Sequence, residues 1–350
     1  MELLEKKLLA SSLSPAFRMI FDKTGHAKVS VDFDKIGTDA VSPENAIAEF
    51  EKTVSAGNNS ICVEGVGTFT AEKKCCSKPF CGKIAIVTGS AQGFGAGIAE
   101  NLAMLGASVA VCDMNYDGAL KEAQKIKDEY GTDAIAVNVN VTDEESVKNM
   151  ICETVCAFGG LDIFVNNAGV VRAGSLEEMT KQNFEFVTSV DYTAFFICTK
   201  YAVAPMKLQR QYAPDYMCDV IEINSKSGLE GSNKNFAYAG AKFGGIGLTQ
   251  SFALELAPYG IKVNAVCPGN FLDGPLWSDP EKGLFVQYLK AGKVPGAKTV
   301  ADVRAAYEAK VPLGRGCTVP DVARAIRYIV EQKYETGQAL PVTGGQTMLN

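Results

Sequence analysis

The chain has 350 residues, a formal net charge of −6 and a hydrophobic content of 47%. This content allows a sizeable core, and the length allows either one large domain or a domain with an extension. A nucleic-acid-binding protein usually carries a basic surplus, so the acidic balance argues against that class. The sequence contains no run of eighteen or more apolar residues, so we expect no membrane span.

The N-terminal residues, MELLEKKLLASSL, include acidic side chains and only short apolar runs. They do not look like a secretory signal, so we expect a cytoplasmic protein whose cysteines are mostly reduced and buried. The exception is the cluster of Cys75, Cys76 and Cys81, which could hold a metal ion. It lacks a C-x-x-C pair, however, and His26 is the single histidine of the chain. We therefore expect neither a metal site nor a catalytic triad based on histidine.

The first 80 residues predict a small mixed α/β extension. Residues 28–34 alternate as a strand does, residues 42–56 open with Ser-Pro-Glu like a capped helix, and residues 59–70 suggest a strand broken by glycines. A charged seam follows at 71–83. No chemistry can be assigned to this extension. It could support oligomer contacts, cover the cleft of the next domain, or be the remnant of a fused domain.

Residues 81–350 predict one domain in which strands and helices alternate without interruption. The expected strands are 84–89, 108–113, 134–139, 161–166, 219–224, 261–266 and 339–342. The expected helices are 95–105, 117–130, 143–158, 182–209 and 236–259. This alternation predicts an α/β fold of the Rossmann type, with a doubly wound parallel sheet and helices on both faces.

The turn after the first of these strands reads Thr-Gly-Ser-Ala-Gln-Gly-Phe-Gly. Its glycines let the backbone turn sharply and let a pyrophosphate approach the next helix, where free N–H groups favour anions. A plain strand-to-helix turn would also explain a glycine triplet, but the preceding apolar strand and the following helix favour a phosphate loop. The expected cofactor-binding residues of the loop are Gly89, Gln92, Gly93, Phe94 and Gly95.

Asp113 stands at the tip of the second strand of this domain. A carboxylate there can accept both ribose hydroxyls of NAD and repel the 2′-phosphate of NADP. The alternative is an ordinary turn or helix-capping aspartate. We expect the cofactor to be NAD.

The stretch EINSKSGLEGSNKNFAYAGAKF places Tyr238 four residues before Lys242 and thirteen after Ser225. One interpretation is the face of an amphipathic helix, on which residues four apart are neighbours. The other is a proton-transfer site, in which small residues let a cofactor and a substrate approach the tyrosine. The rest of the sequence favours the second interpretation.

These features, together with Asn166-Asn167-Ala168-Gly169, Pro268-Gly269 and Thr336-Gly337, resemble the short-chain dehydrogenase/reductase family over residues 82–350. The resemblance implies that Tyr238 is the general acid/base and that Ser225 hydrogen-bonds the substrate oxygen. It also implies that Lys242 holds the nicotinamide ribose and lowers the pKa of Tyr238, which is ordinarily about 10.

The resemblance implies further cofactor contacts, at Asn167, Ala168, Gly169, Asn140, Val141, Pro268 and Gly269. Asn140 and Val141 would lie beside the adenine. The family more often has an aspartate where this chain has Asn140, whose amide oxygen could still accept from the adenine amino group. Family members are commonly homodimers or homotetramers built on their long helices, here 182–209 and 236–259.

One position departs from the family pattern. The fourth catalytic residue is usually an asparagine that follows a valine, whereas this chain reads Val190-Asp191-Tyr192. Asp191 could anchor the relay water through its backbone carbonyl. It could equally weaken the relay or change its pH dependence, and both interpretations stay open.

A narrower resemblance, at 224–228, 241–261, 310–317 and 337–348, is to bacterial sorbitol-6-phosphate 2-dehydrogenases. It implies a small-molecule substrate, a polyol phosphate, whose reacting oxygen would meet Ser225 and Tyr238. A phosphate needs cations nearby, and Lys226 and Lys234 are the candidates in this stretch. Either lysine could meet the phosphate, or both could be solvated loop residues. Trp277 could stack on the substrate or serve as a packing anchor.

Two alternatives to this substrate remain. The chain could oxidise an unphosphorylated polyol or another small hydroxy compound. It could also be a catalytically idle NAD-binding sensor, although the intact Ser225, Tyr238 and Lys242 argue against that.

Overall fold

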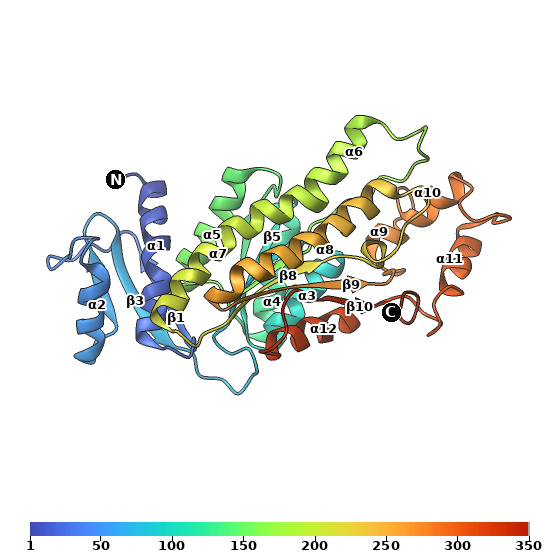
Figure 1. The fold of residues 1–350 in the computed structure, drawn as a ribbon. Helices are drawn as coiled ribbons and strands as arrows, with labels where there is room; N and C mark the ends of the chain where they lie inside the picture. The colour runs from blue at the N-terminus through green and yellow to red at the C-terminus, as the bar shows by residue number, and fades with distance from the viewer. Residues whose placement is uncertain (349–350) are drawn as a thin grey trace.

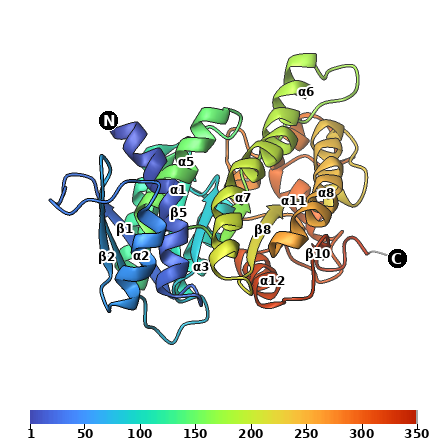
Figure 2. The same cartoon turned by 60° about the vertical axis from the view of Figure 1, so that its left-hand side comes forward.

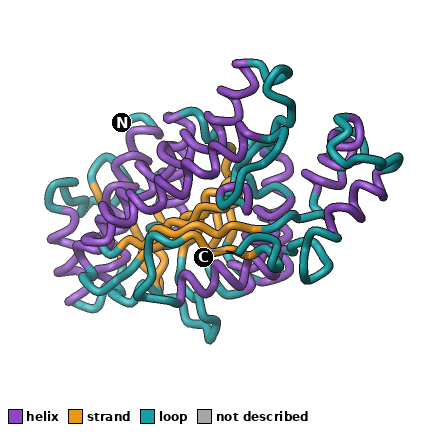
Figure 3. Tube along the Cα trace, turned by 45° about the vertical axis from the view of Figure 1, so that its right-hand side comes forward, coloured by secondary structure: helices purple, strands orange, loops and turns teal. Residues whose placement is uncertain are grey.

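The computed structural model describes residues 1–348 and contains two sheets. The large sheet has seven strands in the order β10-β9-β8-β7-β4-β5-β6, and all of its neighbouring pairs are parallel. Figure 3 shows its strands in orange between helices. The strands are β4 (Ile84–Thr88), β5 (Ser108–Asp113), β6 (Ala134–Asn138), β7 (Ile163–Asn166), β8 (Cys218–Ile223), β9 (Ile261–Pro268) and β10 (Ala339–Val342).

Helices cover both faces of this sheet, each with its own apolar core. One core is built on α5 (Glu144–Phe158), α7 (Ala194–Tyr212) and α8 (Phe236–Leu256). The other is built on α3 (Gly93–Met104), α4 (Tyr116–Tyr130) and α12 (Val319–Glu331). The central strands are buried throughout because they are covered on both sides, as in β4 and β9. The predicted doubly wound Rossmann-type sheet is confirmed.

The expected helix 182–209 is not one regular element. It consists of α6 (Lys181–Thr188), a π-helical turn at Ser189–Thr193, and α7. Single π-helical turns inside α-helices are frequent at functional sites, and this one contains Asp191. Helical periodicity in a sequence does not distinguish a π-helical turn from an ordinary α-helical turn. The sequence therefore predicted one continuous helix.

The N-terminal segment forms a second, antiparallel sheet in the order β1-β3-β2, with two helices. The elements are α1 (Leu3–Phe21), β1 (Ala27–Asp32), α2 (Ala46–Ser55), β2 (Ser60–Val63) and β3 (Gly67–Lys73). The expected strand 59–70 is therefore two strands joined by a turn. The sequence did not predict α1, in which Pro15 lies within the helix and Arg18 is fully buried.

The N-terminal sheet and helices have their own apolar core, in which Phe17 packs on Phe50 and Phe69 with ring centroids 4.6 and 4.9 Å apart. Helix α1 also packs against α5 and α7 of the large domain (Figure 2). The segment is thus bound to the Rossmann domain by an apolar helix face as well as by the covalent connection.

The buried guanidinium of Arg18 joins the two parts of the chain. It donates two hydrogen bonds to Asp162, at 2.9 and 2.7 Å, and three more to the carbonyls of Ala27, Gly25 and Gly82. Asp162 also accepts from Tyr216, Gln209 and the backbone N–H of Ile84. The side chains of Arg18 and Asp162 are both fully buried. The guanidinium and the carboxylate therefore take their hydrogen-bond partners from the protein and not from water.

Asp162 and Gly82 precede β7 and β4, so Arg18 binds at the amino ends of the parallel strands. The segment that follows the carboxyl end of β9 forms a lid of three short helices, α9 (Pro275–Ser278), α10 (Leu284–Lys290) and α11 (Val300–Glu308). Figure 1 shows the N-terminal segment and these helices at opposite ends of the molecule. The N-terminal segment therefore does not cover the cleft at the carboxyl ends of the strands.

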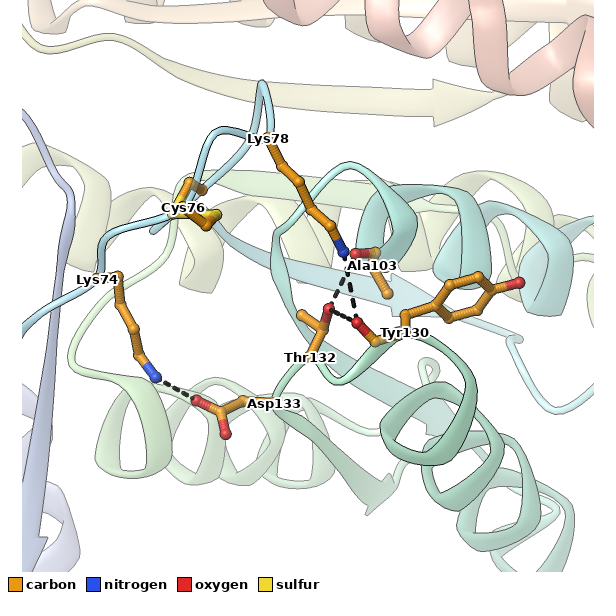
Figure 4. Close-up of a disulfide and its surroundings, with 8 residues drawn as sticks. Lys74, Cys76, Lys78, Ala103, Tyr130, Thr132 and Asp133 are labelled. Carbon is orange, nitrogen blue, oxygen red and sulfur yellow. Dashed lines mark hydrogen bonds and ion pairs between the residues drawn. A yellow bond between two sulfur atoms is a disulfide. The ribbon is translucent and has the colours of Figure 1, made fainter.

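The seam between the two parts carries a disulfide between Cys76 and Cys81 (Figure 4). Lys74, on the same loop, pairs with Asp133 at 3.0 Å, and Lys78 donates to the carbonyl of Tyr130. The sequence had set Cys76 and Cys81 apart, with Cys75, as an exception to the reduced and buried cysteines, but it did not predict a disulfide there. The disulfide removes two of the three thiols that this cysteine cluster could have offered to a metal ion. Of the nine free cysteines, seven are buried, as expected of small apolar residues.

Candidate active site

The phosphate loop connects β4 to α3 in a conformation that requires glycine. Gly89 and Gly93 have φ angles of 63° and 64°, in the left-handed region. A Cβ on Gly95 would lie 2.1 Å from the carbonyl oxygen of Gly89. Any side chain at position 95 would therefore clash with the backbone of the loop. Gln92, the residue before α3, makes no side-chain cap, and the first turn of the helix holds no acidic residue. The free N–H groups at this helix end are therefore open to an anion.

The turn after β7 is tied to this loop. The side-chain amide of Asn167 donates to the carbonyls of Thr88 and Gly89, at 2.9 and 3.0 Å. The hydroxyl of Thr88 accepts from the backbone N–H groups of Asn167 and Ala168. These bonds hold the turn after β7 against the phosphate loop at the carboxyl ends of β4 and β7, where the strand order of the sheet reverses. This switch point is where ligands bind in doubly wound sheets.

Asp113 ends β5 beside the same loop. One carboxylate oxygen accepts from the N–H of Ala91, and the other accepts from the N–H of Asn115, both at 2.9 Å. Each oxygen keeps further acceptor capacity, so a ribose hydroxyl can still donate to it. The two backbone bonds hold the carboxylate at the carboxyl end of the strand.

The remaining predicted cofactor residues lie along the carboxyl edge of the sheet. The side-chain oxygen of Asn140 accepts from the N–H and the hydroxyl of Thr142, so the oxygen expected to meet an adenine is already engaged. Val141 is buried in a core cluster. Pro268 ends β9, and the N–H of Gly269 donates to the carbonyl of Val342.

Ser225, Tyr238 and Lys242 are brought together at the end of β8. Ser225 follows that strand, and its hydroxyl accepts from the N–H of Ser227 at 3.1 Å. Tyr238 and Lys242 stand one turn apart on α8, with the ammonium 5.6 Å from the centroid of the tyrosine ring. Lys242 is 2% exposed and donates to the carbonyl of Ile223 at 3.0 Å. The helix spacing and the strand end together create the constellation that the sequence predicted.

The electrostatics of Tyr238 differ in one respect from the expectation. Burial raises its pKa, Lys242 lowers it, and the charge of Asp191 raises it again, so the net shift of the pKa is upward. Burial lowers the pKa of Lys242, but its neighbours Tyr238, Asp191 and Glu222 raise it by more, so the lysine stays a cation. Lys242 thus acts on Tyr238 in the expected direction, but two buried carboxylates oppose it.

Asp191 is 1% exposed and faces the catalytic lysine. One carboxylate oxygen lies 3.6 Å from the ammonium of Lys242, and the other accepts from the N–H of Val170 at 3.1 Å. A Cβ on Gly169 would lie 2.7 Å from the first oxygen, so the bare backbone of this glycine makes room for the carboxylate. Burial raises the pKa of Asp191 to about 6, although Lys242 and the N–H of Val170 oppose the rise.

Replacing Asp191 with asparagine is expected to move the ascending limb of the pH profile of kcat/KM, in the direction of alcohol oxidation, toward lower pH. The reason is that the variant removes a negative charge that raises the pKa of Tyr238. The measurement is initial velocity between pH 6 and 10 for wild type and Asp191→Asn. A limb at unchanged pH would show that the carboxylate of Asp191 does not act on the tyrosine.

Glu222 is a site residue that the sequence did not reveal. It is fully buried in β8, where its carboxylate accepts from the amide of Asn224 at 2.9 Å and from the hydroxyl of Thr249 at 3.3 Å. Burial raises its pKa to about 7, and Lys242 opposes this rise. A Cβ on Gly245 would lie 2.1 Å from the other carboxylate oxygen. The only signal in the sequence is a glutamate within an otherwise apolar strand.

The lid closes over the tyrosine side of the site. Trp277 is 5% exposed and packs against Phe285, Tyr288 and Tyr307, with ring centroids 4.8 to 5.6 Å apart. Of the two roles considered for Trp277, the structure thus supports the packing anchor. Tyr238 packs against this aromatic cluster. Phe94 of the phosphate loop stacks on Phe271 at the base of the lid, with centroids 4.5 Å apart.

The site fits a dinucleotide on its own geometry. Gly89 and Gly95 leave room that a side chain would fill, and the start of α3 offers unpaired N–H groups. Ser225, Tyr238 and Lys242 lie at the carboxyl end of β8, two strands from the loop in the same sheet. Across residues 1–348, no group of three or more His, Cys, Asp or Glu side chains could hold a metal ion. In the same range, no helix is both long and apolar enough to cross a membrane.

Comparison with known proteins agrees with this geometry. The family model described as short chain dehydrogenase matches residues 83–279. The sorbitol-6-phosphate 2-dehydrogenase of Escherichia coli is 37% identical over 271 residues, which is 76% of this chain and 99% of that enzyme. A 3-oxoacyl-[acyl-carrier-protein] reductase of Staphylococcus aureus is 35% identical, over 76% of this chain and 98% of its own.

A solved structure gives the same comparison in three dimensions. The crystal structure of sorbitol-6-phosphate 2-dehydrogenase from Erwinia amylovora matches with a TM-score of 0.68 and 38% identity, over 76% of this chain and all of that one. The residues that the family model matches begin after the N-terminal segment. From these matches and the site geometry, the chain belongs to the short-chain dehydrogenase family of oxidoreductases, which typically bind a nicotinamide cofactor.

Proposed function

We propose that the chain oxidises a secondary hydroxyl of a small polyol phosphate with NAD, and that sorbitol 6-phosphate, giving fructose 6-phosphate, is the first substrate to test. The observation that carries the proposal is the alignment with a sorbitol-6-phosphate 2-dehydrogenase over 99% of that enzyme. The structure supports it because the hydroxyl groups of Ser225 and Tyr238 are hydrogen-bonded and Lys242 lies one helical turn from Tyr238, at the end of β8.

The chain's residues divide the chemistry between them. In its ionised form, Tyr238 takes the proton of the substrate hydroxyl, and Ser225 orients that oxygen. Lys242, a buried cation, stabilises the tyrosinate. NAD, when bound, supplies the hydride acceptor, so one alcohol gives one ketone, one hydride and one proton.

The measurement is NADH formation, followed by absorbance, with NAD and either sorbitol 6-phosphate or free sorbitol. A 3-oxoacyl thioester with NADPH is the competing substrate, because relatives of that activity are 35% identical. The proposal expects a higher kcat/KM for the phosphorylated polyol. Turnover of free sorbitol but not of sorbitol 6-phosphate, or turnover of the thioester but of neither polyol, would contradict the proposal. NADH binding without turnover of any substrate would favour the sensor interpretation.

The preference for NAD rests on Asp113. The variant Asp113→Asn keeps an oxygen that accepts from Ala91 or Asn115 but removes the charge that would repel a 2′-phosphate. We expect the ratio of kcat/KM for NADP to that for NAD to rise about tenfold or more, because opposing like charges costs several kcal/mol. The ratio is measured with both cofactors at one ionic strength. An unchanged ratio would remove Asp113 as the discriminating group.

We also propose a homodimer or homotetramer built on α7 and α8. The outward faces of these helices carry Phe196 and Phe243, each about half exposed, and Leu254, which is 82% exposed. Exposed apolar side chains on adjacent helices are typical of a subunit interface. Light scattering after size exclusion gives the assembly mass directly, and a monomer would contradict the proposal.

A further inference from the structure

Cationic side chains from two separate segments converge beside the catalytic tyrosine. Two come from the loop that follows Ser225 and two come from the lid. This lysine cluster consists of Lys226, Lys234, Lys293 and Lys310. The two segments touch directly, because the ammonium of Lys234 donates to the carbonyl of Ala291 at 3.2 Å, two residues before Lys293.

The lid lysines are held by aromatic rings. Tyr288 and Tyr307 stack with centroids 5.6 Å apart and an interplanar angle of 21°. The ammonium of Lys293 lies 4.0 Å from the centroid of the Tyr288 ring, and that of Lys310 lies 4.5 Å from the centroid of the Tyr307 ring. Ring faces attract cations, so each ring of the stacked pair holds one ammonium group on the lid.

The cluster has too few carboxylates to balance its charge. Lys226 pairs with Glu230 at 2.9 Å. Within the chain from 1 to 348, no carboxylate lies within ion-pair distance of the other three lysines, although Glu178 is near enough to Lys234 to feel its charge. Burial, and then the charges of the other three lysines, lower the pKa of Lys293 to about 8. A bound dianion would relieve this repulsion.

The cluster lies beside the proton-transfer site. Tyr238 packs in the same aromatic cluster as Tyr288 and Tyr307, and its charge contributes to the raised pKa of Tyr288. Tyr238 and the ammonium of Lys293 therefore both lie against the aromatic cluster that contains Tyr288. In a hexitol 6-phosphate, four carbon–carbon bonds separate the carbon that is oxidised at position 2 from the one that carries the phosphate. In such a substrate the phosphate thus lies at the other end of the carbon chain from the hydroxyl that reacts.

Lys234 has a further feature of a ligand-binding position. Its φ angle is 56°, and it is the one residue other than glycine with positive φ among residues 1–348. Such a conformation is strained for a residue with a side chain and tends to persist at functional sites. The backbone carbonyl of Lys234 also accepts from the N–H of Gly174, which fixes the loop in place.

We propose that the lysine cluster is the subsite for the phosphate dianion of a small phosphorylated alcohol. Lysines bind phosphate as point charges, and four of them supply charge-assisted hydrogen bonds from two sides of one anion. The identity of the alcohol rests on the function proposed above. The anion site itself rests on the cluster.

The first experiment compares Lys293→Gln with a matched control, Lys290→Gln, an exposed lysine of α10 that lies outside the cluster. We expect Lys293→Gln to raise KM for sorbitol 6-phosphate about 10- to 100-fold, the range for losing a hydrogen bond to a charged group. We expect little change in kcat and none in KM for free sorbitol. Lys290→Gln should match wild type with both substrates.

The second experiment does not depend on turnover. Acetic anhydride at pH 8 modifies uncharged amines, and the pKa of Lys293 is lowered to about 8 by burial and by the neighbouring lysines, so Lys293 should react faster than the exposed Lys290. Mass spectrometry of the wild-type protein measures both rates with and without inorganic phosphate. We expect phosphate to slow modification of Lys293 by severalfold and to leave Lys290 unchanged. Chloride at the same ionic strength is the control for screening.

The two experiments separate the subsite from the substrate. Protection of Lys293 by phosphate, without turnover of sorbitol 6-phosphate, upholds the subsite and overturns the proposed substrate. Turnover of sorbitol 6-phosphate with an unchanged KM in Lys293→Gln upholds the function and overturns the subsite. Equal modification rates with and without phosphate also overturn the subsite, whichever substrate reacts.

Discussion

Tyr238→Phe is expected to lower kcat for alcohol oxidation about 10²- to 10⁴-fold, the usual contribution of a positioned acid/base group. The variant keeps the ring that packs against the lid and removes only the hydroxyl that exchanges the proton. We therefore expect binding of NADH and the KM for the alcohol to change little. Absorbance of NADH gives kcat, and the fluorescence of bound NADH gives its dissociation constant.

The matched control is Tyr328→Phe. Tyr328 lies on the exposed face of α12, and its hydroxyl donates a hydrogen bond to Glu335. This variant should leave both quantities unchanged. Wild-type kcat/KM for oxidation should rise with pH, because the ionised tyrosine is the base and its pKa is raised by burial. A Tyr238→Phe protein with more than a tenth of wild-type kcat would assign the proton transfer to another group.

Arg18→Met is expected to lower the free energy of unfolding by about 3–5 kcal/mol, because it leaves the buried carboxylate of Asp162 without its cation. Methionine fills part of the volume but cannot donate to Asp162 or to the three carbonyls that Arg18 binds. Urea denaturation at pH 7 measures the change. The exposed ion pair of Arg327 and Glu331 provides the control, since Arg327→Met should cost less than about 1 kcal/mol.

The double variant Arg18→Met with Asp162→Asn should recover part of the loss, because the amide carries no charge that needs a cation. Burial raises the pKa of Asp162, but Arg18 and Lys83 outweigh it, so the net shift is downward. A lowered carboxyl pKa stabilises the fold above the ordinary value of about 3.9, and this stabilisation is lost as the pH falls below it. A loss of less than 1 kcal/mol in Arg18→Met would show that the pair does not hold the N-terminal segment.

The parts of the fold that sequence predicted are those encoded by neighbouring residues. Alternation of apolar strands with amphipathic helices is a local pattern, so the parallel sheet from β4 onward was predictable. Tyr238 and Lys242 lie one turn apart on a single helix, so their proximity also follows from their spacing. The helix α1 was missed because a buried arginine breaks the apolar pattern, and its partner Asp162 lies 144 residues away.

The sequence alone determined the class of fold, the glycine loop and the tyrosine–lysine pair, because each depends on backbone geometry within one turn or one helix. Tertiary structure decided what surrounds them. It set Glu222 and Asp191 beside Lys242, so that burial and charge raise the pKa of Tyr238 rather than lower it. It also brought Lys293 and Lys310 to Lys226 and Lys234. Burial and long-range charge depend on contacts between distant segments, and local patterns in the chain do not record those contacts.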